Sequence, residues 1–113
     1  MRDRLGANGA ICAAAAAALA AYASHAAAPD DRARLFIAAA FGFGHGLAMA
    51  ALSPLPLGRL GRAGLWATYL GMLLFAGSLV LAVFAGASTQ FAPIGGMAMI
   101  GGWLLFAIDS WRG

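Results

Sequence analysis

The sequence predicts an all-α polytopic membrane protein, an antiparallel bundle of four transmembrane helices with short loops, forming a single membrane domain over residues 1–113. Composition is the first observation behind this prediction. Of the 113 residues, 63% are hydrophobic and 10% are charged, whereas an average soluble domain has about 25% charged residues. Small domains bury only about 60% of the surface of their unfolded chain. Lipid is therefore the expected solvent for most of this chain.

The second observation is a set of four apolar windows, each about as long as the 20 residues that a membrane-spanning helix needs. The segments between the windows are charged or rich in helix breakers: Asp30 to Arg34, SPLPLGRLGR (53–62) and GASTQFAP (86–93). Pro93 suits the first turn of the last helix. Short connections make consecutive helices antiparallel neighbours. The expected spans are residues 5–28, 35–52, 63–85 and 94–111.

The stretch AYASHAAAPDD (21–31) raises the question of whether the first window is a helix or a cleaved leader. Arginines at positions 2 and 4, an apolar run and small residues at 26–28 are typical of a signal peptide. The apolar run nevertheless continues to Ala28, over about 24 residues or roughly 36 Å of helix. A signal-peptide core has only about 7–15 residues. We therefore expect the first helix to be retained.

The arginines predict an orientation. Four spans put both termini on one side of the membrane, and that side carries five arginines: Arg2, Arg4, Arg59, Arg62 and Arg112. The other side carries Arg32 and Arg34. The positive-inside rule then places both termini in the cytoplasm, and Trp66, Tyr69 and Trp111 fall where an aromatic belt is expected on that side. The expected location is the bacterial inner membrane.

Small residues indicate where helices pack. In the second window they recur every four positions and form a ridge that a second backbone can approach closely. Glycine pairs in the fourth window, and one glycine in the third, likewise let a second helix approach the backbone closely. The predicted packing residues are Ala38, Gly42, Gly46, Ala50, Gly77, Gly95, Gly96, Gly101 and Gly102. The sequence leaves open whether they face this chain or a second subunit.

Four polar residues are the candidates for chemistry: His25, His45, Ser78 and Asp109. Ionisable groups inside a membrane are rare and often functional, yet one hydrogen bond satisfies the donor of a neutral imidazole. For the histidines, packing, a proton or ligand path, and metal or haem binding all stay open. Ser78 is expected to bond to a carbonyl of its own helix or to pair across to a neighbouring helix. Asp109 is expected to pair with Arg112, three residues further on.

The two histidines are not expected to share a metal within one chain. If Asp31 is the middle of the first hairpin, His25 lies six residues before it and His45 fourteen after it. The depth difference of eight residues is roughly 12 Å, whereas metal–ligand bonds are about 2 Å long. His25 should lie near the outer surface and His45 near the membrane centre. No metal and no cofactor are expected, and the single cysteine, Cys12, excludes an intrachain disulfide.

Four stretches together carry a family resemblance: AAYASHAA (20–27), GHGLAMAAL (44–52), GMLLFAGSLVLA (71–82) and APIGGMAMIGGWLLFAI (92–108). Over nearly its whole length the chain resembles the small four-helix inner-membrane proteins of domain of unknown function family 423. That family includes the bacterial YgdD-like proteins and the eukaryotic transmembrane protein 256. The resemblance implies a retained first helix and brings no established activity.

The expected function is structural. The chain contains no glutamate, no lysine, no metal-spaced cluster and no glycine-rich phosphate loop, and its arginines are too scattered for nucleic acid. We therefore expect a non-enzymatic assembly or interaction subunit in the lipid bilayer, packing as a homo-oligomer or within a larger membrane complex. The alternative is a minimal oligomeric transporter or channel that uses His25 and His45. A third reading is a haem- or metal-binding membrane protein.

Retention of the first helix can be tested by intact-mass spectrometry of the purified protein. The measured mass should include the first helix, because its apolar run is longer than a signal-peptide core. A mass that begins near Ala28 or Pro29 would contradict this prediction.

Overall fold

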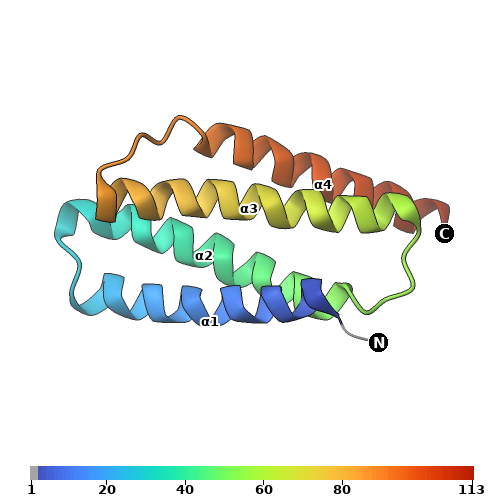
Figure 1. The fold of residues 1–113 in the computed structure, drawn as a ribbon, viewed down its shortest axis with the longest axis horizontal. Helices are drawn as coiled ribbons and strands as arrows, with labels where there is room; N and C mark the ends of the chain where they lie inside the picture. Colours follow the sequence, from blue (N-terminus) through green and yellow to red (C-terminus); the bar gives the residue numbers. More distant parts are fainter. Residues whose placement is uncertain (1–2) are drawn as a thin grey trace.

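The structure is a computed structural model that describes residues 3–113 (Figure 1). The described chain forms helices α1 (Arg4–His25), α2 (Pro29–Leu52), α3 (Arg59–Ala85) and α4 (Ala92–Arg112), with no strand in that part. All four helices are long and apolar enough to cross a membrane. The predicted fold class, an all-α membrane protein with four spanning helices, is confirmed.

The four helices are arranged as two antiparallel hairpins. Helix α1 packs along α2, α3 packs along α4, and the two hairpins meet mainly through α2 and α3. In Figure 1, α1 and α4 lie at opposite edges, and both termini lie at the same end. The bundle is wider than it is deep, with extents of 47 × 27 × 19 Å. The helices thus form an open row and not a closed square.

The helix ends explain why the helices differ in length from the apolar windows. Helix α2 begins at Pro29 and not at residue 35, with Asp30 and Asp31 in its first turn, where carboxylates favour the positive end of the helix dipole. Helix α3 begins at Arg59 and ends at Ala85, and the next residue, Gly86, caps it with φ +67°, a conformation suited to glycine. Polar first turns therefore lengthen the helices beyond the apolar segment.

At the other end of the molecule, Arg32 fastens the α1–α2 turn. Its Nε donates to the carbonyl oxygen of Ala23 at 3.2 Å, and its Nη2 donates to that of Ala27 at 3.4 Å. Ala23 lies in the last turn of α1, where carbonyls have no partner within the helix, and Ala27 lies in the turn that follows. Helix α1 accordingly ends at His25 and not at Ala28. The AYASHAAAPDD stretch is thus the capped end of a helix followed by a tight turn.

The α1–α2 hairpin is held by direct backbone contact. A Cβ atom placed on Gly9 would lie 2.5 Å from the carbonyl oxygen of Gly46, and one placed on Gly46 would lie 2.5 Å from that of Gly9. The second of these Cβ atoms would also lie 2.9 Å from the backbone nitrogen of Ala13. The neighbouring Gly42 faces the Cβ of Ala16. No side chain fits between the two helices at this crossing.

The α3–α4 hairpin has two such direct backbone contacts. A Cβ on Gly64 would lie 2.6 Å from the carbonyl oxygen of Gly102, and one on Gly71 would lie 2.7 Å from that of Gly95. In each helix the two glycines are seven residues apart, so they lie on one face. The hydroxyl of Thr68, fully buried and without a hydrogen-bond partner, lies against Gly102. It is placed to accept a weak Cα–H contact from that glycine.

The predicted packing residues divide into two groups. Most face a neighbouring helix: Ala38, Gly42, Gly46, Gly95 and Gly102 are buried, and Ala50 and Gly96 are partly buried. Gly77 and Gly101 make no such close contact, because a Cβ on either would meet no atom of a neighbouring helix within 4 Å. Gly77 lines a hollow between α1, α2 and α3, and Gly101 is exposed. Successive helix residues are about 100° apart around the axis. Since Gly102 faces α3, its neighbour Gly101 faces outward.

These glycines provide a matched test. Gly46→Ala and Gly102→Ala should each lower the stability of the detergent-solubilised protein by about 1–3 kcal/mol, because the added methyl group meets backbone atoms. Gly101→Ala and Gly77→Ala should leave the melting temperature unchanged or raise it, since alanine favours helix by up to about 1 kcal/mol. Equal effects at Gly101 and Gly102 would contradict the helix pairing.

Candidate functional site

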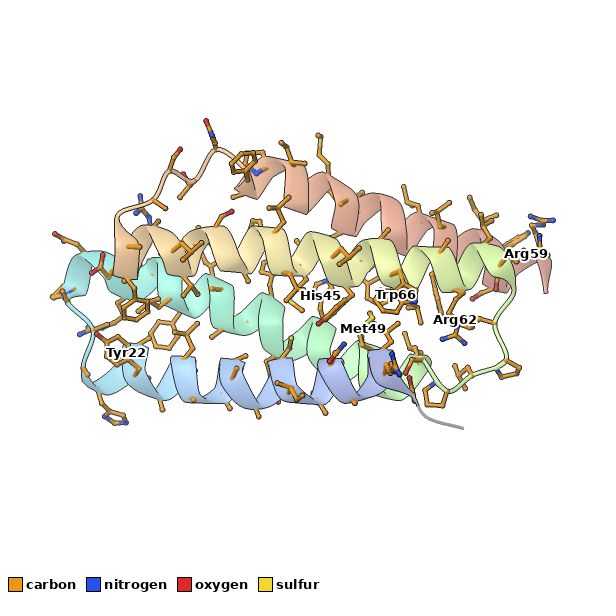
Figure 2. All side chains as sticks on the ribbon, in the orientation of Figure 1. Tyr22, His45, Met49, Arg59, Arg62 and Trp66 are labelled. Atoms are coloured by element: carbon orange, nitrogen blue, oxygen red, sulfur yellow. The ribbon has the colours of Figure 1, made fainter. Side chains whose placement is uncertain are left out.

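The four candidate polar residues do not form one site. His25 is the exposed last residue of α1, whereas His45 lies near the middle of the bundle, as Figure 2 shows. Ser78 belongs to α3 and Asp109 to the last turns of α4. Each of the three residues other than His25 has a different hydrogen-bond partner within the chain.

His45 forms a bridge between α2 and α4. The indole Nε1 of Trp103 donates to His45 Nε2 at 3.0 Å, and His45 Nδ1 lies 2.9 Å from the carbonyl oxygen of Phe41, one turn earlier. Helices α2 and α4 belong to different hairpins. The hydrogen bond between His45 and Trp103 therefore fastens one hairpin to the other.

The hydrogen-bond partners of His45 select one tautomer of its ring. An indole N–H can only donate a hydrogen bond, so His45 Nε2 must present its lone pair to Trp103. The ring proton is then on Nδ1, where it is donated to Phe41. This neutral tautomer satisfies both ring nitrogens.

Aromatic side chains surround the bridge. The ring of Phe41 stacks on His45 at 5.7 Å and 16°, and it also meets Phe75 of α3 at 4.8 Å. Two shallow hollows of about 250 and 330 Å³ flank the pair, and His45 is the only ionisable residue lining them in the described chain. A metal at this site would have to displace Trp103 or Phe41 from an imidazole nitrogen.

Ser78 and Asp109 are also bound within the chain. Ser78 Oγ donates to the carbonyl oxygen of Leu74 at 2.6 Å, which is one of the two partners that the sequence predicts. The predicted pairing of Asp109 with Arg112 is wrong, because Asp109 Oδ2 instead accepts the backbone N–H of Gly58 at 3.2 Å. In the antiparallel hairpin the end of α4 lies beside the start of α3. The free N–H groups and positive dipole there attract the carboxylate.

A polar cluster that the sequence does not predict joins α1 to the α2–α3 loop. Asp3 accepts hydrogen bonds from Ser53 Oγ at 2.5 Å and from the Gly6 N–H at 2.9 Å. Together with the nearby Arg62 guanidinium, and led by the Ser53 bond, these contacts hold the pKa of Asp3 below its usual value. The stabilisation is complete above the ordinary pKa of an aspartate and is lost as the pH falls through the lowered pKa.

Comparison with known proteins identifies the family. The family described as "Protein of unknown function (DUF423)" matches residues 17–96, which is more than half of the chain. The chain belongs to the DUF423 family. The DUF423 match includes His25, His45 and the Gly42–Gly46 ridge, and it stops before Trp103. No significant match was found among curated proteins or among solved structures.

The His45–Trp103 bridge can be measured with a double-mutant cycle. Trp103→Phe and His45→Phe should each destabilise the folded protein, and the cycle should give a coupling energy of about 0.5–1.5 kcal/mol, as for a single hydrogen bond. Both variants should still fold, and the unfolding free energies should be measured in detergent.

His25→Ala combined with Trp103→Phe is the matched control. The effects of these two substitutions should add, because the residues share no partner. A coupling energy of zero between His45 and Trp103 would contradict the bridge.

Proposed function

We propose that this DUF423 protein is a non-enzymatic structural or assembly subunit that packs with itself or within a larger membrane complex. The observation that carries the proposal is the use of its polar groups. His45, Ser78 and Asp109 each bind their own chain, so the groups most suited to chemistry stabilise the fold. Among residues 3–113 no group of three His, Cys, Asp or Glu side chains is placed to hold a metal ion.

The lipid-facing surface supports a role in packing. In a bilayer, helices associate through close contact at small residues and not through hydrophobic drive. Gly44 and Gly101 are exposed, and a Cβ placed on either would meet no atom of a neighbouring helix within 4 Å. At these positions a neighbouring helix would approach the backbone most closely.

The proposed location is the bacterial inner membrane, with both termini in the cytoplasm. Arg4, Arg59, Arg62 and Arg112 lie at the end that carries the termini, and Arg32 and Arg34 lie at the opposite end. The positive-inside rule favours the arginine-rich end as the cytoplasmic one.

Purification in mild detergent tests the proposal. Wild-type protein should elute as a defined homo-oligomer or with a stoichiometric membrane partner, without a Soret band and without stoichiometric metal. Gly101→Leu should abolish that association and leave the melting temperature unchanged, because Gly101 is exposed and a Cβ there would meet no atom of a neighbouring helix. Gly44→Leu reports in the same way on the exposed face of α2.

The competing functions give different results in the same sample. A monomer that conducts ions or takes up solute in liposomes would replace the proposal with a channel or transporter. A Soret band or bound metal that is lost in His45→Ala would replace it with haem or metal binding.

A further inference from the structure

A crevice opens at the end of the molecule that carries both termini. It lies between the start of α1 and the α2–α3 loop, has a volume of about 590 Å³, and its lining includes Asp3, Arg4, Leu5, Ser53, Arg62 and Trp66. Figure 2 shows Arg62 and Trp66 on the first turns of α3 at this end. Leu5 is almost fully buried at 3% exposure, while Trp66 is 40% exposed. The crevice therefore combines apolar walls with a rim of two guanidinium groups and one carboxylate, that of Asp3, which leaves a net positive charge.

The rim is fixed by hydrogen bonds. Arg62 donates to the carbonyl oxygens of Ser53 at 2.7 Å and of Leu55 at 3.1 Å, which holds the loop against α3. Ser53 in turn binds Asp3, so the loop is also tied to α1. These bonds use two of the five N–H groups that a guanidinium offers. Arg4 is exposed and makes no side-chain hydrogen bond within the described chain.

Charge distinguishes this end from the other. In the described chain it carries four arginines against two aspartates, Asp3 and Asp109. The opposite end carries two arginines, Arg32 and Arg34, against two aspartates, Asp30 and Asp31. Only the end with the crevice is complementary to an anionic surface.

The position of the crevice identifies the anion. It lies where α1 and α3 begin and α2 ends, which for helices that cross a bilayer is the level of the lipid headgroups. Arginine binds phosphate through paired N–H groups, and tryptophan is enriched at the headgroup level of membranes. We propose that this crevice binds the headgroup of an anionic phospholipid, with Arg4 and Arg62 on the phosphate and Trp66 against the glycerol and upper acyl chains.

Lipid titration of the purified protein in neutral detergent tests this site. Phosphatidylglycerol should raise the melting temperature with saturation, phosphatidylcholine should have much less effect, and the effect should weaken with salt. Arg4→Gln should weaken the apparent affinity for phosphatidylglycerol about fivefold, the value of one surface charge near anionic lipid. Its melting temperature without lipid should equal that of wild type, because Arg4 makes no internal bond.

Two control variants locate the binding. Arg34→Gln at the opposite end should leave the affinity unchanged. Arg59→Gln should have much less effect than Arg4→Gln, because Arg59 lines a separate hollow beside Asp109. Equal losses for Arg4→Gln and Arg59→Gln would show diffuse attraction to the charged end and overturn the crevice.

A titration with inorganic phosphate distinguishes binding of a lipid headgroup from binding of a free phosphate ion. Stabilisation by inorganic phosphate at the concentrations at which phosphatidylglycerol acts would overturn the lipid assignment. Equal stabilisation by phosphatidylcholine and phosphatidylglycerol would overturn the role of charge. Since the purified chain alone is titrated, the result is independent of whether the protein has a partner subunit.

Discussion

Backbone-to-backbone contact at glycine is the constraint on which the rest of this structure depends. Inside a bilayer the hydrophobic effect does not drive two apolar helices together. Paired helices must therefore gain dispersion energy and weak Cα–H contacts at short range. Short-range contact is possible in the α1–α2 hairpin because of Gly9 and Gly46, and in the α3–α4 hairpin because of Gly64 and Gly102. Small residues consequently occupy the crossing within each hairpin, and many large apolar residues, such as Ile11 and Leu104, lie on the outside, at 65% and 60% exposure.

The connection between the hairpins is of a different kind. It depends on larger side chains where α2 meets α3, such as Met49 and Met72, and on the His45–Trp103 hydrogen bond. A hydrogen bond is directional, so the His45–Trp103 pair fixes how far α4 is shifted along α2. A contact between smooth glycine surfaces restrains that shift less. His45 thereby sets the register between α2 and α4, and so between the two hairpins.

The sequence predicts the helices well because apolar windows and helix breakers are local signals. It predicts only part of the packing. The ridge at Gly42 and Gly46 follows from spacing within one helix, whereas the partners Gly64 and Gly71 were missed although their seven-residue spacing matches that of Gly95 and Gly102. Trp103 as the partner of His45, and Asp109 at the start of α3, depend on the register between helices. Rules of spacing within one helix contain no information about that register.

The open row of helices gives α1 a role that composition alone does not reveal. A closed four-helix ring would hold each helix through two neighbours, but α1 packs mainly on α2. Its closest backbone approach to α2 is at Gly9, Ala13 and Ala16, which cover the Gly42–Gly46 ridge. Without α1 the Gly42–Gly46 ridge would be exposed to lipid, although its shape fits the backbone of another helix. Ser53 would also lose its hydrogen bond to the carboxylate of Asp3. The alanine-rich first helix is thus a component of the fold, and its small side chains are what allow the contact.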